Sequence, residues 1–230
     1  IMVIEIDEKY TKEVFKDFKP DYLIVTNITK DQPPRQHNVD ITYKEIVSTL
    51  PKNTAIVTMM DEPYLRNFEL ELPNKVIYYG LSKNEFSYQN QLFENLNTYY
   101  CPKCHHKLKY EYYNFETLGK YACESCDFKW EIPFVLGDNL NLEQETISIN
   151  DKEITIGGDM LFFAYNTLAA YTMAKVLNIK DDKLVESINK VNKKHSYSKN
   201  VNFMCDNVLY KELKVKAEDA PTFNQAVFKI

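Results

Sequence analysis

Four cysteines in two pairs constrain this chain more than any other feature. Cys101 and Cys104 form one Cys-x2-Cys pair, and Cys123 and Cys126 form a second pair after eighteen intervening residues. Each pair turns two thiolates toward one point, and two such pairs complete the tetrahedron that zinc prefers. Four thiolates leave no open coordination position, so we predict one structural zinc ion rather than a catalytic one. The eighteen intervening residues suit a β-hairpin that returns the chain to the metal.

The residues around the cysteine pairs leave a few alternatives. His105 and His106 directly follow the first pair and could compete as ligands, although adjacent histidines at this place are typically exposed. A glycine would suit the tight turn after Cys104 better than His105 does. The remaining cysteine, Cys205, stands alone in the sequence and is interpreted as a small core residue. This cysteine usage favours a metal-binding protein of the reducing cytoplasm over a disulfide framework.

Composition narrows the class of protein. The chain has 230 residues, of which 44% are hydrophobic, which is enough for one large domain or for a domain with a small insert. No apolar run is long enough to span a membrane, and no signal peptide is recognisable. A net charge of −5 gives no electrostatic reason to expect a nucleic-acid partner. Because the first residue is Ile rather than Met, and a buried-strand pattern follows with nothing before it to cover it, we expect a piece of a longer protein, cut inside a domain.

Short β-rich runs alternate with helical patterns outside the cysteine region. The β-rich runs cover residues 2–6, 22–26, 55–58 and 75–79, and helical patterns cover residues 10–18 and 43–50. Such alternation predicts a parallel sheet with right-handed crossovers. Further along, the sequence predicts a hairpin over residues 145–156, helices over 161–177 and 182–191, and β-like runs at 201–204 and 208–215.

These patterns predict an α/β fold in which a mostly parallel sheet is flanked by helices and carries a small inserted zinc ribbon of β type. We assign residues 1–98 and 134–216 to the α/β domain, 99–133 to the ribbon, and 217–230 to the start of a C-terminal lobe. Zinc binding contributes on the order of 10 kcal/mol to the folding of such ribbons. Chelation is therefore expected to unfold the ribbon and to leave the sheet largely intact.

An ordered set of motifs resembles a known family. The set comprises VIEIDE at residues 3–8, TNI at 26–28, Asp31-Gln32 with Arg35, the CPxC…CxxC insert, and AYNTLAA at 164–170. Together these motifs are similar to the central domain of the MurT-like subunits of lipid II isoglutaminyl synthase, over residues 2 to about 179. The resemblance implies a domain like the central domain of Mur ligases, incomplete at its N-terminus.

The resemblance also implies an activity. Proteins of this family are ATP-dependent amide ligases that amidate the glutamate of the peptidoglycan stem peptide, carried by lipid II or its precursor. A carboxylate is phosphorylated, and ammonia supplied by a GatD-like glutamine amidotransferase then attacks the acyl phosphate. The implied cofactors are ATP and Mg²⁺, beside structural Zn²⁺, and the implied location is the cytoplasm.

The resemblance points to five residues outside the cysteine pairs. Glu5 matches the strand-end carboxylate that holds magnesium, and Glu5 and Arg35 are the catalytic candidates. Asn27 and Asp31 fall after the second strand and would face the same crevice, since ligands gather at the carboxyl ends of parallel strands. Asn166 matches the helix-start asparagine that contacts the nucleotide, and a helix cap is its alternative interpretation.

Several departures from the family pattern bear on activity. The five glycines of the chain cannot form the phosphate-binding loop GxxxxGK[ST]. Residues 59–63 (MMDEP) stand where the family has an Asn-Ala-Asp-Asp-Pro-like turn, and Pro33-Pro34 and Asn38 are further substitutions. We therefore expect the fragment to be inactive as a ligase. The alternative function is a non-catalytic, degenerate ligase domain whose zinc ribbon docks a protein partner.

Overall fold

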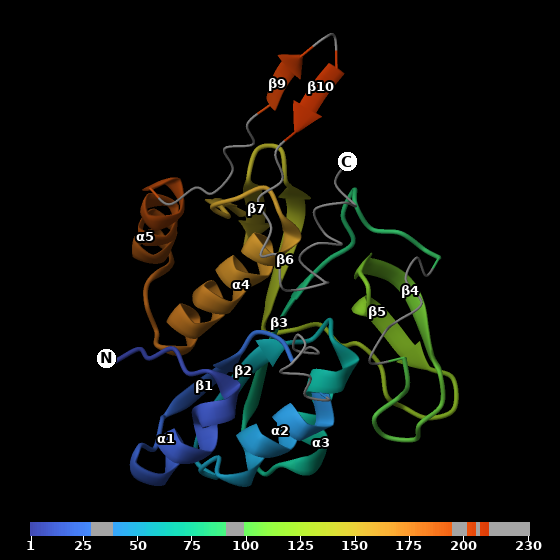
Figure 1. Ribbon diagram of the computed structural model, residues 1–230, viewed down its shortest axis with the longest axis vertical. Helices are drawn as coiled ribbons and strands as arrows, with labels where there is room; N and C mark the ends of the chain where they lie inside the picture. Colours follow the sequence, from blue (N-terminus) through green and yellow to red (C-terminus); the bar gives the residue numbers. More distant parts are fainter. Residues whose placement is uncertain (29–38, 91–98, 195–201, 206–207, 212–230) are drawn as a thin grey trace. The chain divides into compact units, whose positions relative to one another are not determined.

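The computed structural model of the chain divides into two compact units, residues 1–136 and residues 137–230 (Figure 1). It describes residues 1–28, 39–90, 99–194, 202–205 and 208–211. The expected start of a C-terminal lobe, residues 217–230, lies outside the described residues. Within the described ranges, no helix is both long enough and apolar enough to cross a membrane.

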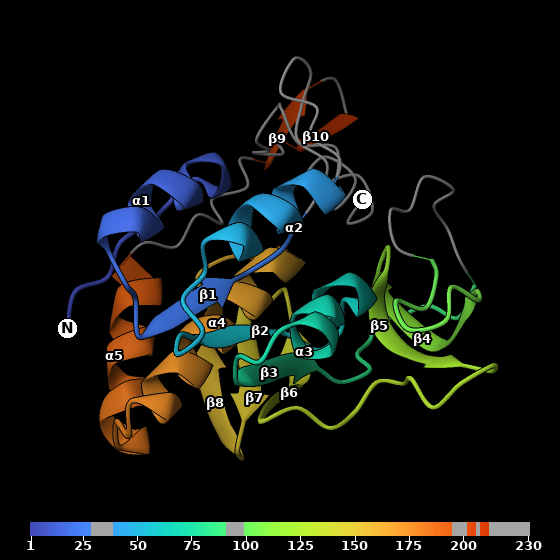
Figure 2. The ribbon, with the colours of Figure 1, turned by 90° about the horizontal axis from the view of Figure 1, so that it is seen from below.

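The first unit is built on a parallel sheet whose strands neighbour one another in chain order. Its elements are η1 (Glu8–Tyr10), α1 (Thr11–Asp17), β1 (Tyr22–Val25), α2 (Val39–Ser48), β2 (Ala55–Met59), η2 (Pro63–Arg66), α3 (Asn67–Glu71), β3 (Val76–Leu81), β4 (Leu108–Phe115) and β5 (Leu118–Cys123). Strand β2 lies between β1 and β3, and Val57 is paired with Ile24 on one side and Ile77 on the other. Helices α1 and α2 lie side by side over these strands (Figure 2). The strands and helices expected between residues 10 and 79 are thereby confirmed.

Helix α2 shows why this layer forms. Val39, Tyr43 and Ile46 recur at helical spacing and are buried, so that one stripe of the helix packs inward. The ring of Tyr43 contacts Phe68 of α3, with centroids 5.1 Å apart. The core therefore extends from the sheet through α2 to the short helix after β2.

The first seven residues correct one prediction. Residues 2–6 are not a buried strand: Ile1 is fully exposed, Val3 is 89% exposed and Met2 is 66% exposed. An apolar run becomes a strand only when a neighbouring strand supplies hydrogen bonds, and no described strand pairs with this segment. Glu5 is thus an exposed residue before η1, not the end of a parallel strand.

The second unit contains an antiparallel meander and two helices. Its elements are β6 (Val135–Asn141), whose first residues still belong to the first unit, β7 (Thr146–Ile149), β8 (Lys152–Thr155), α4 (Leu161–Val176), α5 (Asp181–Lys194), β9 (Asn202–Cys205) and β10 (Val208–Lys211). Strand β7 pairs antiparallel with β6 and with β8. The expected hairpin and the two helices are confirmed, and so are the two final β-like runs over their described residues, whereas residues 201 and 212–215 lie outside the described ranges. Strand β6 was not expected.

Helix α5 covers the free edge of β8, the last strand of its sheet. Asn189 accepts a hydrogen bond from the Thr155 N–H (2.7 Å), and Asn192 donates one to the Thr155 carbonyl (2.5 Å). Two amide side chains thus satisfy backbone groups that an edge strand would otherwise leave open for pairing.

The turn between β7 and β8 yields a stability prediction. Asn150 and Asp151 both have positive φ, 51° and 60°, the conformation of a two-residue hairpin turn. Asp151→Gly removes the steric cost of a side chain there, so we expect the free energy of unfolding to rise by about 0.5–1 kcal/mol. Chemical denaturation measures this change. Glu153→Gly, placed within β8, should instead lower stability; a loss of stability in Asp151→Gly as well would contradict the assigned turn.

Candidate functional site

The four paired cysteines converge on one point. Their Sγ atoms all lie within 4.8 Å of one another. The Sγ atoms of Cys101 and Cys126 are 3.6 Å apart, and those of Cys104 and Cys123 are 3.4 Å apart. A tetrahedral zinc ion with bonds of about 2.3 Å separates its thiolates by about 3.8 Å. The donor set therefore fits a zinc-sized ion that holds one Cys-x2-Cys pair on each side.

The two cysteine pairs are built alike. The N–H of Cys101 donates to the carbonyl of His106, and the N–H of Cys123 donates to the carbonyl of Phe128, both at 2.8 Å. Each first cysteine thus closes a loop with the residue five positions later. The strands β4 and β5 form the antiparallel hairpin that was predicted to return the chain to the metal.

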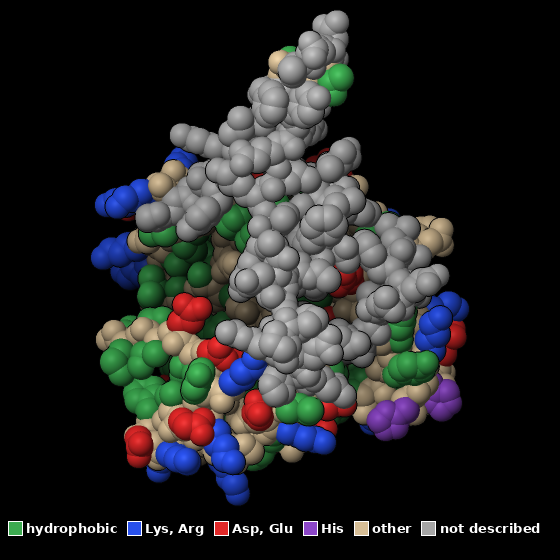
Figure 3. Space-filling model, in the orientation of Figure 1, with side chains coloured by type: hydrophobic (Ala, Val, Ile, Leu, Met, Phe, Trp, Pro, Cys, Tyr) green, Lys and Arg blue, Asp and Glu red, His purple; other side chains and the backbone are tan. Residues whose placement is uncertain are grey.

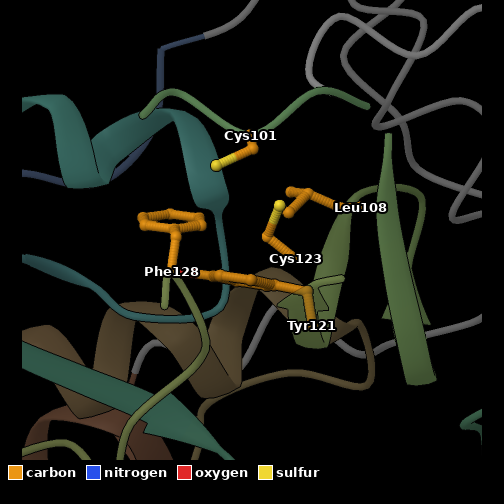
Figure 4. Close-up of a cluster of buried hydrophobic side chains, with 5 residues drawn as sticks. All are labelled: Cys101, Leu108, Tyr121, Cys123 and Phe128. Carbon is orange, nitrogen blue, oxygen red and sulfur yellow. The ribbon is translucent and has the colours of Figure 1, made fainter. Parts of the chain in front are cut away.

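A small apolar core stands behind the thiols. Cys101 and Cys123 are buried together with Leu108, Tyr121 and Phe128 (Figure 4). The rings of Tyr121 and Phe128 stack with centroids 5.5 Å apart. These few side chains are a small core for a ribbon of this size, and small domains of this kind depend on a metal to fold.

The thiols differ in acidity. Burial raises the pKa of Cys101 to about 12. Burial also opposes ionisation of Cys123, but the N–H of Ser125, which donates to its Sγ at 3.4 Å, and the neighbouring thiols outweigh burial and lower the pKa of Cys123 to about 7. One thiolate is therefore available near neutral pH to meet a metal ion, and binding then displaces the remaining protons.

The two histidines after the first pair stay outside this cluster. His105 and His106 are exposed, and they supply the purple side chains of Figure 3. His105 adopts a positive φ of 60°, so the turn after Cys104 has the left-handed backbone for which a glycine was expected to be better suited.

The ribbon is docked on the segment that follows β2. Tyr121 Oη donates to the Met60 carbonyl (2.8 Å), and Arg66 Nη1 donates to the Lys129 carbonyl (3.0 Å). The Trp130 indole N–H donates to Asp61 Oδ1 (2.8 Å). Every one of these bonds joins the segment after β2 to a ribbon residue, so the insert is packed against the parallel sheet of its own unit.

Two acidic residues after β2 are engaged by this docking. Asp61 is fully buried, and its second oxygen accepts the Leu81 N–H at 2.8 Å. Glu62 caps η2 by accepting the Tyr64 N–H, and its other oxygen accepts the hydroxyl of Thr117. Carboxylates at this end of a parallel sheet are where a ligand site is expected, and here both take part in holding the ribbon.

Sequence reasoning did not select Asp61, Arg66 or Trp130 as site residues. The segment containing Asp61 was noted only as a departure from a family pattern. The available signal was an acidic residue directly after a buried strand, in a chain with a single tryptophan.

The residues selected from the family pattern fall in different places. Asn27 is exposed two residues after β1, at the carboxyl end of the parallel sheet. Glu5 is exposed in the first segment, and Asp31 and Arg35 lie outside the described residues. Asn166 is exposed in the second turn of α4 within the second unit, and Met160 is the N-cap of that helix. The cap interpretation of Asn166 is therefore wrong, because a cap must precede the first helical turn.

Comparisons with known proteins confirm the resemblance. The chain is 29% identical over 184 residues to "Lipid II isoglutaminyl synthase (glutamine-hydrolyzing) subunit MurT" of Staphylococcus aureus, covering 79% of this chain and 41% of the relative. The subunit of the same name from Streptococcus pneumoniae is 27% identical over 191 residues, covering 81% of this chain and 42% of the relative. The chain thus spans less than half the length of the curated relatives it matches. No protein-family model matches it.

A solved structure supports the fold class. A pseudomurein peptide ligase type C from Methanothermus fervidus superposes with a TM-score of 0.61 and 26% sequence identity, covering 78% of this chain and 36% of that chain. The expected α/β fold, with parallel strands flanked by helices and a cysteine-bearing insert, is confirmed.

The cysteine cluster predicts how many zinc ions the chain binds and which cysteines this binding requires. We expect one zinc ion per chain by elemental analysis and loss of that zinc in Cys101→Ser, because three thiolates cannot close the buried site. Cys205→Ser removes the cysteine that belongs to neither Cys-x2-Cys pair and should retain a full complement of metal. Finding no zinc in the purified wild-type chain, or full zinc in Cys101→Ser, would contradict the assigned site.

The first turn of the ribbon predicts a gain in metal affinity. His105→Gly relieves the left-handed strain and should strengthen zinc binding about fivefold, corresponding to about 1 kcal/mol, in competition with a chromophoric chelator. His106→Gly is the matched control, since His106 is not among the residues with positive φ. Equal effects of the two substitutions would show that backbone strain at residue 105 is not their cause.

Proposed function

We propose that this chain is the central part of a MurT-like ligase subunit, which amidates the glutamate of the peptidoglycan stem peptide on lipid II or its precursor. The observation that carries the proposal is the 29% identity over 184 residues to a protein named lipid II isoglutaminyl synthase (glutamine-hydrolyzing) subunit MurT. The likeness to a solved pseudomurein peptide ligase supports a ligase function. The full-length protein would act in the cytoplasm with a GatD-like glutamine amidotransferase as the source of ammonia.

The site of the proposed reaction is the carboxyl end of β1–β3. ATP with Mg²⁺ would supply the phosphoryl group that activates the substrate carboxylate for attack by ammonia. Asn27 is exposed at this end of the sheet and can donate and accept hydrogen bonds there. We assign the binding of nucleotide and metal to Asn27 and Asp31, and the catalytic roles to Glu5 and Arg35. Asn166, in the second unit, is assigned a nucleotide contact from the family pattern alone.

Magnesium binding has to rely on carboxylates that the ribbon does not use. Asp61 and Glu62 lie at the correct end of β2, but both oxygens of each already accept hydrogen bonds. Mg²⁺ prefers carboxylate and water oxygens. The proposal therefore gives this role to Glu5 and Asp31, which have the required chemistry.

The zinc ion is proposed to be structural. Four thiolates close its coordination sphere, and a small buried core surrounds them. Zinc therefore takes no part in the proposed phosphoryl or ammonia transfer, and the fragment from residue 1 to residue 230 is expected to be inactive without the remaining segments of a ligase.

Nucleotide binding and amidation in the full-length protein test this proposal. Asn27→Ala should weaken Mg²⁺-dependent ATP binding at least tenfold and lower amidation of lipid II, followed by mass spectrometry with glutamine and the amidotransferase present. Asn53→Ala is a matched control, because Asn53 is exposed before the amino end of β2, away from the carboxyl ends of the strands.

Two results would argue against the ligase. Full-length protein that binds no ATP, but captures a partner through the ribbon, would favour the non-catalytic docking domain. Unchanged ATP binding in Asn27→Ala would remove this residue from the proposed site.

A further inference from the structure

We propose that Asp61 is a positioning residue that joins the ribbon to the ends of β2 and β3, so that metal binding by the ribbon and ordering of residues 60–66 are thermodynamically linked. This inference goes beyond the proposed function, because it involves neither nucleotide nor substrate. It also changes the expectation drawn from the sequence, in which loss of metal affected only the ribbon.

The carboxylate of Asp61 accepts one hydrogen bond from β3 and one from the ribbon. Oδ2 accepts the backbone N–H of Leu81, the last residue of β3, and Oδ1 accepts the indole N–H of Trp130 in the ribbon, both at 2.8 Å. The carbonyl of Asp61 accepts a third bond from the Gly119 N–H at 3.0 Å. Because Asp61 is fully buried, water cannot replace any donor that is lost.

Two of the five glycines of the chain make room for this arrangement. A Cβ atom on Gly80 would stand 2.7 Å from Asp61 Oδ1, and one on Gly119 would stand 2.2 Å from the Tyr112 carbonyl. Gly80 therefore allows the carboxylate to lie against β3, and Gly119 allows β5 to approach β4 closely while its N–H reaches Asp61. Both glycines are required by space, independently of backbone conformation.

Arg66 closes the other end of the segment. Its guanidinium lies over the rings of Phe128 and Tyr78, 5.2 and 5.3 Å from their centroids, and it donates to Lys129 of the ribbon. Arg66 is itself only 4% exposed. The segment from Met60 to Arg66 is thus held at both ends by ribbon residues.

The same ribbon residues depend on the metal. Phe128 and Tyr121 pack in the buried cluster with Cys101 and Cys123. The backbone N–H of Trp130 donates to the Tyr121 carbonyl at 2.8 Å. When the four thiolates separate, the groups that hold Asp61 and Arg66 lose their support. Thermodynamic linkage is reciprocal: if zinc binding stabilises the Asp61 contacts, the Asp61 contacts stabilise zinc binding by the same free energy. Weakening these contacts must therefore weaken zinc binding, although Asp61 is not a ligand.

Zinc affinity of full-length variants tests this linkage. Asp61→Ala should bind zinc about tenfold more weakly in competition with a chromophoric chelator, a typical loss when outer contacts of a metal site are removed. Asp61→Asn should show a smaller loss, because one of the two carboxylate acceptors becomes a donor. Gly80→Ala should resemble Asp61→Ala, since the added Cβ meets the Asp61 carboxylate first, at 2.7 Å, and Pro133 at the end of the ribbon only at 3.2 Å. Asp182→Ala, at an exposed ion pair in the second unit, is the control.

Tryptophan fluorescence and hydrogen exchange of the wild-type chain, measured with zinc and after its chelation, test the same linkage. Trp130 is the single tryptophan, so chelation should shift the only indole emission as its hydrogen bond to Asp61 is lost. Hydrogen exchange should rise at the Leu81 amide and over residues 60–66 together with the ribbon. Zinc affinities within twofold of wild type for Asp61→Asn and Gly80→Ala, or exchange that rises only in the ribbon, would overturn the proposal. Because neither assay contains nucleotide, failure of the ligase proposal would leave these results unchanged.

Discussion

A carboxylate removed from water is stable only when hydrogen-bond donors surround it, and the first unit is arranged around one such group. Asp61 receives its donors from β3 and from the ribbon, which a second buried hydrogen bond also joins, from the Asn114 side chain to the Leu81 carbonyl. Removing one donor leaves a buried charge partly unpaired, which is more costly than losing an ordinary surface contact. Both carboxylate oxygens of Asp61 are therefore hydrogen-bonded only when the sheet and the ribbon are both folded. The hydrophobic contacts of Tyr121 and Phe128 act in the same direction.

The features that were predictable from the sequence are those with a local signal. Metal-ligand spacing identified the four cysteines, and the Asn150-Asp151 turn and the β-rich runs identified the hairpin and the parallel strands. The contact between Asp61 and Trp130 has no such signal, because the two residues are 69 positions apart. The strand predicted at residues 2–6 was wrong for a related reason, since its apolar run is a local signal whereas a strand needs a distant partner.

The position of the ribbon gives the proposed ligase site a particular constraint. Parallel sheets present their ligands at the carboxyl ends of the strands, and the ribbon occupies part of that end after β2. At this end of the parallel sheet Asn27, two residues after β1, is exposed. A metal centre without catalytic chemistry can still shape an active site by deciding which acidic side chains remain accessible to a substrate.

The wide separation of the docking contacts has a consequence for the kinetics of folding. The bonds from Tyr121 to Met60 and from Trp130 to Asp61 close loops of 61 and 69 residues, whereas the cysteines that face each other are only 25 and 19 positions apart. Contacts of long sequence separation form slowly, because the chain entropy of the loop is lost before the contact rewards it. A metal ion that first gathers the short loops delivers Tyr121 and Trp130 as one preassembled surface. A metal ion bound by the four cysteines would therefore replace several slow long-range contacts with one docking step between a preformed ribbon and the sheet.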